Sequence, residues 1–229
     1  MDSTALKLEP LEDNEVLKNR IYLRLKEAIC SVNIYAGDKE PRLDERQLGE
    51  ALGVSRTPIR EALARLEQEE FIRTVPRKGV FIVRKTKAEI LEMITVWAAL
   101  ESMAARLITK NASNDEISTL RRMFATFDGG QLKARIDEYS LTNISFHQAL
   151  LQLSHCKLLN GIAENLFIHM RSIRMQTIGD RDRVNQSIID HMHIIESLES
   201  RKTEVAERLV REHSLNLAKH VEQHVSYLT

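Results

Sequence analysis

The placement of proline constrains this chain more than any other feature, because all four prolines of its 229 residues lie before residue 80. Proline breaks the interior of a helix, so its absence from the rest of the chain leaves that part free to be helical. Apolar residues recur there at the i, i+3, i+4 and i+7 spacing of an amphipathic helix. We predict six helices, at about residues 87–110, 114–127, 131–153, 156–178, 182–200 and 203–226. The short breaks between them favour antiparallel neighbours, and therefore an all-α bundle.

The first 85 residues follow a different pattern, which is typical of a helix-turn-helix. A helix at about residues 14–32 precedes a polar turn and two shorter helices. Asp44 is placed to cap the first short helix, with Gln47 completing the capping box, and this helix should end at Gly53. Ser55 should cap the second short helix. The apolar positions expected to lie on the facing sides of the two helices are Leu48, Ala51, Leu52, Val54, Ile59, Ala62, Leu63 and Leu66.

A short β-hairpin is predicted after these helices. The segments "FIRTV" and "VFIV" have the composition of strands and flank a basic, glycine-bearing tip, "PRKG". The expected fold class is therefore mainly α, with an N-terminal winged helix-turn-helix followed by an all-α six-helix antiparallel bundle. The expected domains are a flexible arm at residues 1–13, the winged helix-turn-helix at 14–85 and a helical domain at 86–229.

The net charge of the chain is zero, with 33 basic and 33 acidic residues, so no overall positive excess points to nucleic acid. A local excess exists, because eight basic and four acidic residues lie between Arg56 and Lys85. With its apolar face in the core, the second short helix presents Arg56, Thr57 and Arg60 near its N-terminus. That is where a recognition helix meets the edges of the bases.

Other side chains of this region are candidates for contacts around the recognition helix. Arg46, on the preceding helix, is placed to reach a phosphate or a base edge, and the Ser55 hydroxyl and the helix N-terminus to hold a phosphate. Arg77 and Lys78, at the tip of the wing, are placed to enter the minor groove. The alternative is that these residues form an ordinary solvated surface, but a helix-turn-helix followed by a wing favours DNA.

The cysteines and the N-terminus indicate the compartment. Cys30 and Cys156 lie far apart among apolar neighbours, which fits reduced, buried thiols. The N-terminus is acidic and lacks the apolar core of a signal peptide, and no run of 18 apolar residues occurs anywhere. We therefore expect a cytoplasmic protein without a membrane segment.

Histidines are concentrated in the predicted helical domain, where all eight follow residue 145. His147 follows Asn143 by four residues, which places both on one face of a helix. His191 and His213 interrupt other apolar stripes. Three imidazoles and an amide oxygen on different helices are suited to a divalent metal, although spacing alone does not show that they converge. A lone histidine on an apolar face is more often an ordinary core residue.

The segment "DERQLGEALGVSRTPIREALARLEQEEFIRTVPRKGVFIV" resembles the DNA-binding domain of the GntR family of bacterial transcription regulators, whose signature has the form "LAxxLGVSRTPVREALxRLxxxGLV". The resemblance covers about 70 residues. Gly49 replaces the usual alanine and Glu70 the usual glycine, and neither is a reading residue. The resemblance implies that Arg46, Arg56, Thr57, Arg60 and the wing glycine, Gly79, occupy the family's DNA-contact positions. With the candidates above, the predicted DNA-binding set is Arg46, Ser55, Arg56, Thr57, Arg60, Lys78 and Gly79.

The helices that follow resemble the FadR C-terminal domain (FCD) class, nearer its shorter, VanR-like branch. Metal-binding members of this class show "DxxFHxxL", then "EHxxIxxAL", then a histidine 22 residues after the second one. This sequence has "NISFHQAL", "DHMHIIESL" and "REH", so His147, His191 and His213 match, while Asn143 replaces the usual aspartate. The resemblance therefore implies a divalent metal, Zn²⁺ in the first place, with Mn²⁺ and Ni²⁺ as alternatives.

The amide at position 143 affects what else binds, because an amide oxygen is neutral and a weaker ligand than a carboxylate. A bound dication would keep its full charge, so we expect a small carboxylate effector at an open coordination position. Arg171 and Arg174 are candidates to anchor that carboxylate. The resemblance places Trp97 where the class often has an effector-holding arginine. The same residues would alternatively bind an effector, or one another, without metal.

These features predict a homodimeric transcription factor, by family habit a repressor, that binds double-stranded operator DNA with inverted half-sites. A regulator that senses the metal ion itself is the alternative. A metal-dependent hydrolase is disfavoured, because no carboxylate or other base is evidently placed beside His147. His220 and His224 form another i, i+4 pair, but their segment is polar and we predict that both are exposed.

Overall fold

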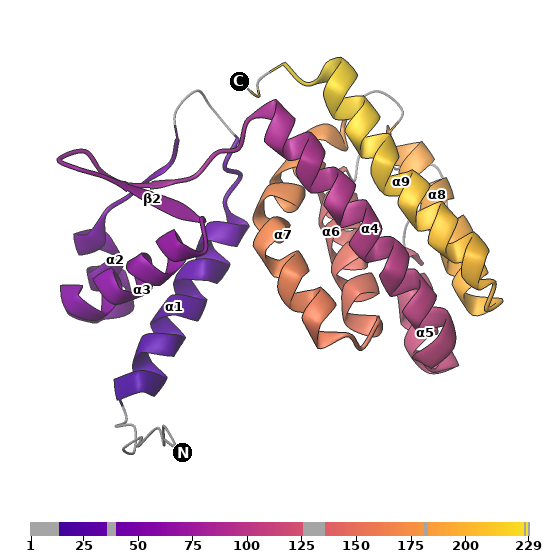
Figure 1. Ribbon diagram of the computed structural model, residues 1–229, viewed down its shortest axis with the longest axis horizontal. Coiled ribbons are helices and arrows are strands. Elements are labelled where there is room, and N and C mark those ends of the chain that lie inside the picture. The colour runs from indigo at the N-terminus through magenta and orange to yellow at the C-terminus, as the bar shows by residue number, and fades with distance from the viewer. Residues whose placement is uncertain (1–13, 36–39, 126–135, 181–182, 227, 229) are drawn as a thin grey trace, which may run out of the picture. The chain divides into compact units, whose positions relative to one another are not determined.

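The computed structural model describes residues 14–35, 40–125, 136–180, 183–226 and 228 (Figure 1). Residues before Arg84 form one compact unit, except Asn33 to Tyr35, which group with the helices after Val83. The mainly α fold class, with a small wing and a helical bundle, is confirmed. The arm predicted at residues 1–13 lies outside the described residues. No helix of the described residues is long and apolar enough to cross a membrane.

The N-terminal unit contains three helices, of which α1 packs on α3. They are α1 (Asn14–Ser31), α2 (Glu45–Leu52) and α3 (Arg56–Gln68). Asp44 caps α2 by accepting the backbone N–H groups of Arg46 and Gln47 at 2.9 and 3.0 Å. The helix ends at Gly53, whose φ of 65° lies in the left-handed region that favours glycine. The core between the helices includes Ile21, Leu25, Ile59, Leu63 and Leu66.

Three details of this unit differ from the predictions. Ser55 occupies the N-cap position of α3, but its side chain makes no capping hydrogen bond. Ala51 and Leu52 are exposed rather than facing α3. The reason is that α2 packs at Gly49, where a Cβ would lie 3.0 Å from the carbonyl oxygen of Val54 in the turn and 4.0 Å from Ile59 of α3. The close approach turns the residues two and three positions later toward solvent.

The wing is a three-stranded antiparallel sheet with the order β1-β3-β2. The predicted hairpin is correct and consists of β2 (Ile72–Val75) and β3 (Gly79–Ile82). The first strand, β1 (Arg42–Leu43), was not predicted; it pairs with β3 so that Arg42 lies opposite Phe81. The sheet therefore ties the chain segment before α2 to the wing.

The helical unit contains the six predicted helices, with ends close to the predicted ones. They are α4 (Lys87–Asn111), α5 (Asn114–Phe124), α6 (Ile136–Leu153), α7 (Lys157–Thr177), α8 (Arg183–Glu199) and α9 (Thr203–His224). The predicted end at residue 127 and start at residue 131 lie outside the described residues. Capping boxes begin two helices, with Thr86 and Glu89 at α4 and Ser113 and Glu116 at α5.

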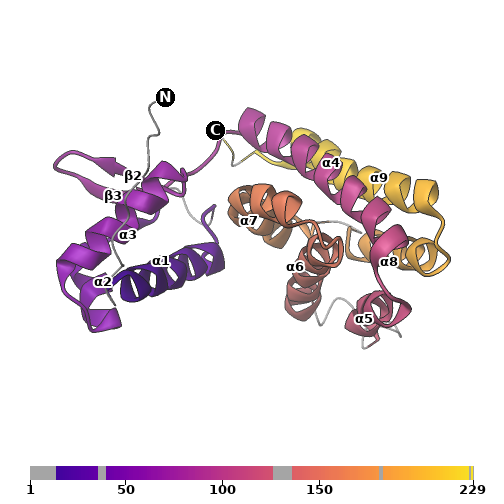
Figure 2. The same cartoon turned by 60° about the horizontal axis from the view of Figure 1, so that its bottom comes forward.

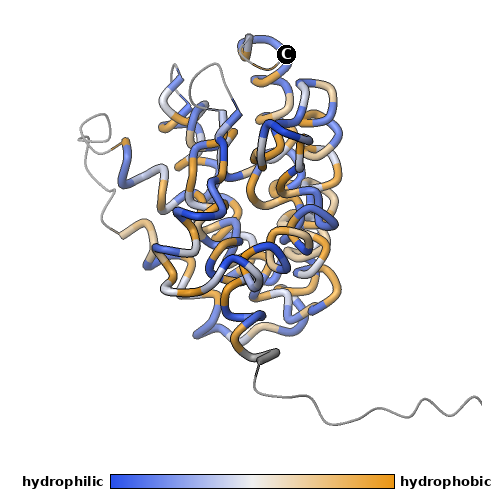
Figure 3. The backbone as a smooth tube through the Cα atoms, turned by 90° about the vertical axis from the view of Figure 1, so that its left-hand side faces the viewer, coloured by the Kyte–Doolittle hydropathy of each residue, from blue (hydrophilic) through white to orange (hydrophobic). Residues whose placement is uncertain are grey.

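Helices α4 and α9 run side by side along their length (Figures 1 and 2). Hydrophobic and hydrophilic residues alternate in bands along each helix, as expected for amphipathic helices in a bundle (Figure 3). The apolar core includes Phe124, Tyr139, Phe146, Ile194 and Leu198. Cys30 and Cys156 are not joined in a disulfide, as predicted for reduced thiols, but both are only half-buried.

Candidate functional site

Three histidines from three helices meet in the interior of the helical unit. His147 lies on α6, His191 on α8 and His213 on α9, and all three side chains are buried. One ring nitrogen from each lies within 4.8 Å of the others. The Nε2 atoms of His191 and His213 are 3.2 Å apart. The folding of the bundle therefore brings together the three imidazoles that the sequence singled out.

The outward nitrogens of two of these rings are held by carboxylates. Nδ1 of His147 lies 2.5 Å from Oε1 of Glu101 on α4, and Nδ1 of His213 lies 3.0 Å from Oδ2 of Asp190 on α8. An ionised carboxylate only accepts hydrogen bonds, so it selects the tautomer that carries the proton on Nδ1. Both rings then turn an unprotonated Nε2 toward the centre of the cluster.

The third ring is held by a tyrosine. The Tyr139 hydroxyl donates to Oγ of Ser187 at 2.8 Å and lies 3.3 Å from Nδ1 of His191. Because its proton is used by Ser187, the hydroxyl oxygen is free to accept the N–H of His191. All three imidazoles are thereby assigned the same tautomer, with their Nε2 lone pairs directed inward. Such outer partners orient histidines that bind metals.

Unpaired atoms at the centre test whether a metal fits there. Nε2 of His147 and Oδ1 of Asn143 are buried and have no hydrogen-bond partner among the described residues. The Nε2 atoms of His191 and His213, 3.2 Å apart, need a proton or a metal cation between them, and with both Nδ1 atoms protonated a metal fills this role. Three imidazole nitrogens and an amide oxygen match the ligands that Zn²⁺ and related dications accept. The residues present therefore fit a divalent metal.

Burial also sets the protonation of the cluster. It lowers the pKa values of His147 and His191 well below the usual range for histidine. Burial likewise lowers the pKa of His213, although the neighbouring Asp190 opposes the shift. All three rings are therefore neutral near pH 7, which is the form that binds a metal.

Glu101 is the functional residue that sequence reasoning missed. It is fully buried, and its Oε2 accepts the Ser214 hydroxyl at 2.6 Å and lies 3.8 Å from Nη2 of Arg174. Burial raises the pKa of Glu101, while the Arg174 charge and the Ser214 hydroxyl oppose the shift and favour the ionised form that accepts the His147 N–H. The expectation that no carboxylate lies beside His147 is therefore wrong. The available signal was a single acid in the apolar stripe of α4, where Ile94, Trp97, Ala98, Ala105 and Ile108 are buried.

The position of Glu101 nonetheless argues against hydrolysis. Its carboxylate contacts Nδ1 of His147, on the opposite side of the ring from the inward Nε2. A general base must lie within hydrogen-bond reach of the water that it activates. Glu101 instead orients His147 and supplies negative charge from behind the ring.

The structure separates the three predicted effector residues. Arg174, on α7, is buried beside Glu101, and burial lowers its pKa to about 10. Trp97, on α4, is buried against Phe167, one helical turn before Glu101. Arg171, three residues before Arg174 on the same helix, is only half-buried. Of the two predicted arginine anchors, Arg174 is the one that lies beside Glu101, the carboxylate that contacts His147.

The remaining histidines of the helical unit lie outside the cluster. His193 is exposed, and so is His224, as predicted for that residue. The predicted exposure of His220 is wrong, because its side chain is buried and its Nε2 lies 3.0 Å from Oδ2 of Asp180. The Asp180 carboxylate, which follows α7, thus gives the buried His220 ring a hydrogen-bond partner.

The predicted DNA-reading residues lie on the surface of the N-terminal unit. Gly79 is half-buried and the others, Arg46, Ser55, Arg56, Thr57, Arg60 and Lys78, are exposed. Nε of Arg60 forms an ion pair with Oε2 of Glu45 at 2.7 Å. Within the described parts of the chain, the Arg56 guanidinium makes no ion pair. It is therefore available to a ligand at the N-terminus of α3.

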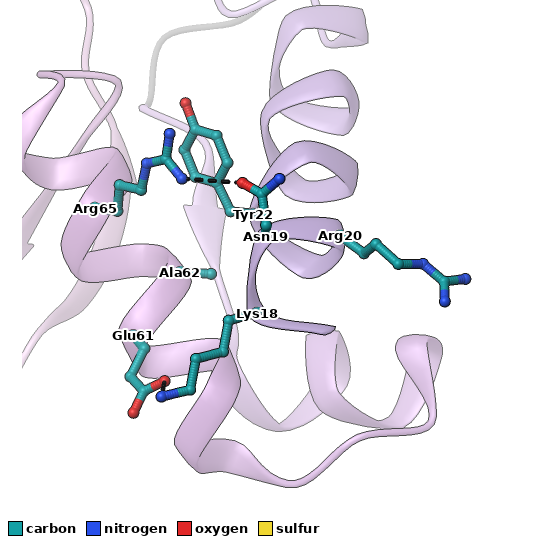
Figure 4. A pocket seen from close by; sticks show the side chains of 7 residues that line it. All are labelled: Lys18, Asn19, Arg20, Tyr22, Glu61, Ala62 and Arg65. Carbon is teal, nitrogen blue, oxygen red and sulfur yellow. Dashed lines mark hydrogen bonds and ion pairs between the residues drawn. The ribbon is translucent and has the colours of Figure 1, made fainter. Parts of the chain in front are cut away.

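A groove in the same unit is formed by side chains that join two helices. It lies between α1 and α3, where Lys18 pairs with Glu61 at 2.9 Å and Arg65 donates to Asn19 at 3.2 Å (Figure 4). The Arg65 guanidinium also covers the ring of Tyr22, 3.6 Å from its centroid. These contacts hold α1 against the recognition helix.

Comparison with known proteins agrees with this architecture. Residues 92–216 match the FCD domain, and residues 17–82 match the bacterial regulatory proteins of the gntR family. The Nta operon transcriptional regulator of Aminobacter aminovorans is 30% identical over 187 residues, which are 80% of this chain and 83% of that protein. The transcriptional repressor RspR of Escherichia coli is 22% identical over 213 residues, or 93% of this chain and 92% of that protein.

Solved structures show the same fold. The structure of E. coli McbR/YncC superimposes with a TM-score of 0.73 at 22% identity and covers 92% of this chain and 99% of that chain. A putative GntR regulator from Rhodococcus sp. RHA1 gives a TM-score of 0.70 at 18% identity, over 92% of this chain and 100% of that chain. The arrangement of a winged helix-turn-helix and an FCD bundle in one chain is therefore shared with these proteins.

Proposed function

Because the chain belongs to the GntR family of DNA-binding transcription regulators and carries an FCD domain, we propose that it is a homodimeric repressor controlled by a small carboxylate at a metal site. Its relatives are transcription regulators and not enzymes. The observation that carries the proposal is the inward Nε2 triad of His147, His191 and His213. The rest of the proposal concerns what this triad binds and how binding alters DNA affinity.

The metal in this proposal is Zn²⁺, held by the three Nε2 atoms with Asn143 as a weak fourth ligand. The carboxylates of Glu101 and Asp190 would make the imidazoles that they contact better donors, as outer partners of metal-bound histidines do. Mn²⁺ and Ni²⁺ remain alternatives, because imidazole and amide ligands suit them as well.

The effector in this proposal is a small carboxylate that binds the metal at an open position. Arg174 supports this chemistry, because it is a buried cation whose Nε has no hydrogen-bond partner among the described residues. An effector carboxylate near Arg174 would complete the pairing that Glu101, 3.8 Å away, provides only in part. The buried Trp97 would contribute an apolar wall.

The DNA ligand in this proposal is an inverted repeat. Each chain carries one DNA-reading unit, so a two-fold dimer requires two half-sites of opposite orientation, about one helical turn apart. Repression is supported by the relative RspR, which is named as a repressor. Control by the effector requires that it bind more tightly to one of two dimer arrangements, only one of which fits the operator.

The metal site is tested by His147→Ala and His191→Ala. Each substitution removes one of three strong ligands, so each variant should retain less than about a tenth of the wild-type metal after dialysis. Elemental analysis of the purified proteins measures this. His193→Ala, on the same helix as His191 but exposed, is the matched control and should keep its metal. Undiminished metal in both cluster variants would reject the site.

DNA binding through α3 is tested by Arg56→Ala in a gel-shift assay on the promoter that adjoins the gene. Loss of a bidentate arginine contact to a base should weaken binding by roughly tenfold or more. Arg208→Ala, an exposed arginine on α9, is the control and should bind like the wild type. If Arg56→Ala also binds like the wild type, α3 does not read the operator as proposed.

A metal-ion sensor is a second candidate, because Glu101 and Asp190 supply negative charge to the site without any effector. The two functions differ in what changes the affinity for DNA. Fluorescence anisotropy with operator DNA should be run with Zn²⁺ alone, and then with a panel of small carboxylates at fixed Zn²⁺. A change with metal alone favours the sensor. A change that needs the acid favours the metabolite receptor, and an acid response that persists in a chelator favours metal-free binding.

A further inference from the structure

We infer that Arg42 is a DNA-contacting residue that binds a backbone phosphate of the operator beside the wing. Arg42 lies on β1, opposite Phe81 of β3, and is not among the residues that the sequence singled out. The inference rests on the DNA-binding function of the family and on the contacts of the wing. It does not depend on the proposed metal or effector.

The side chain of Arg42 lies across the wing glycine. A Cβ built on Gly79 would lie 2.9 Å from Nε, 3.3 Å from Nη2 and 3.4 Å from Cζ of Arg42. The guanidinium therefore occupies the space that any larger residue at position 79 would fill. Gly79 also has a φ of 115°, a conformation that other residues rarely adopt. The glycine is thus required for its conformation and for the arginine that packs on it.

The charge of Arg42 is not neutralised within the protein. Arg42 is exposed and forms no ion pair or side-chain hydrogen bond among the residues that the structure describes. Asp44 is near enough for the Arg42 charge to help lower its pKa, but the largest cause is the hydrogen bond from the backbone of Gln47 at the start of α2. The Asp44 carboxylate is therefore engaged as a helix cap rather than as a partner of Arg42.

Two other arginines of the same unit, Arg73 and Arg60, are each paired with a glutamate, unlike Arg42. Arg73, on β2, forms an ion pair with Glu40 and lies over the ring of Phe81, with its Cζ 5.7 Å from the centroid. Arg60 is paired with Glu45. Arg42, Arg77 and Lys78 therefore form a basic group around the wing tip, and none of the three has an acidic ion-pair partner among the described residues.

The wing tip supplies a second observation that this surface is functional. Residues 75–78 form a β-turn closed by the N–H of Lys78 and the carbonyl of Val75 at 3.0 Å. Arg77, the third residue of this turn, has a φ of 62°, as in a type II turn, where glycine or asparagine is favoured. A strained arginine at this place indicates that its charged side chain is needed there. Arg42, Arg77 and Lys78 thus surround Gly79 with positive charge.

A phosphate is the ligand that this arrangement fits best. The guanidinium lies beside Gly79 and is exposed, so that its N–H groups can form a paired contact with two phosphate oxygens. A contact of this kind holds the protein on the duplex but carries no information about sequence. Arg42 should therefore raise the affinity for every operator by the same factor, whatever its base sequence.

The test is Arg42→Ala in the full-length protein, with operator duplexes selected from random sequences by the wild type. Fluorescence anisotropy at several salt concentrations should show roughly tenfold weaker binding at low salt and a salt dependence reduced by about one ion. Arg42→Lys should recover part of the affinity. The loss should be equal for operators with different flanking bases.

Arg73→Ala is the matched control, because Arg73 lies in the same sheet but is already paired with Glu40. It should bind nearly as the wild type does. Wild-type affinity and salt dependence in Arg42→Ala, or an equal loss in Arg73→Ala, would overturn the assignment, and so would a loss confined to particular flanking bases. If circular dichroism shows that Arg42→Ala is misfolded, Arg42→Gln provides the same comparison with a side chain of similar length.

Discussion

Asn143 is the residue at which the candidate metal centre differs most from the pattern that it resembles. Its amide oxygen brings no charge, which by itself would leave a bound dication uncompensated. Glu101 and Asp190 change this balance, because each holds an imidazole from behind and supplies negative charge through it. In the proposed metal centre, the charge that compensates the cation would therefore come from these outer partners rather than from the fourth ligand.

Asn143→Asp should tighten Zn²⁺ binding by roughly tenfold or more, because a carboxylate attracts the cation more strongly than an amide. It should also weaken any dependence of metal binding on an added carboxylate. Competition with a chromogenic chelator measures both effects. An unchanged Zn²⁺ affinity in Asn143→Asp would mean that position 143 is not a ligand.

At the scale of elements, helix ends carry stability that does not depend on the site. The α4 helix begins with a reciprocal capping box, in which the Thr86 hydroxyl accepts the N–H of Glu89 and the Glu89 carboxylate accepts the N–H of Thr86. The box satisfies backbone groups that the helix itself leaves unpaired. The capping box thus fixes the first turn of α4, which begins three residues after the helical unit resumes at Arg84.

Thr86→Ala should lower the free energy of unfolding of the helical unit by about 1 kcal/mol, because the N-cap hydrogen bond is lost. Thermal unfolding followed by circular dichroism measures the change. Thr95→Ala is the matched control on the same helix, since the Thr95 hydroxyl bonds only to the carbonyl of Leu91, within its own helix. Equal shifts in the two variants would contradict the assignment of the cap.

At the scale of the whole molecule, the segments that join the two units are both held by the helical unit. The Tyr35 hydroxyl lies 2.9 Å from Nδ1 of His169 on α7, and Nε of Arg84 donates to the Ile34 carbonyl at 2.6 Å. His169 is buried, and burial lowers its pKa to about 4. A neutral imidazole therefore accepts the Tyr35 proton within the folded protein.

Acid should destabilise the helical unit through His169. The unfolded chain binds a proton at the ordinary histidine pKa of about 6.5, whereas the folded chain binds it only near 4. The free energy of unfolding should therefore fall as the pH falls from about 6.5 to about 4, and be fully retained above that range. Buried His147 and His191, whose pKa values are also lowered, should act in the same direction.

The measurement is the unfolding midpoint against pH in the presence of a chelator. His169→Gln keeps a side chain that can accept the Tyr35 hydrogen bond but does not titrate, so its midpoint should depend less steeply on pH. Parallel curves for the wild type and His169→Gln would show that His169 does not contribute.

The sequence by itself determined the features that depend on neighbours a few residues away. The helices follow from apolar periodicity and the absence of proline, and the turn of the helix-turn-helix follows from Gly53. The shared face of Asn143 and His147 follows from helical spacing. The family resemblance, carried by local motifs, was confirmed by the matches to both domains.

Only the tertiary structure decided which side chains meet across the fold. Glu101 contacts His147 from 46 positions away, and Arg42 packs on Gly79 through a two-residue strand too short to recognise in the sequence. The tertiary structure also determined which ring nitrogen of each histidine faces inward, because each tautomer depends on a hydrogen-bond partner from another helix. Local patterns specify the elements, but long-range packing specifies the chemistry between them.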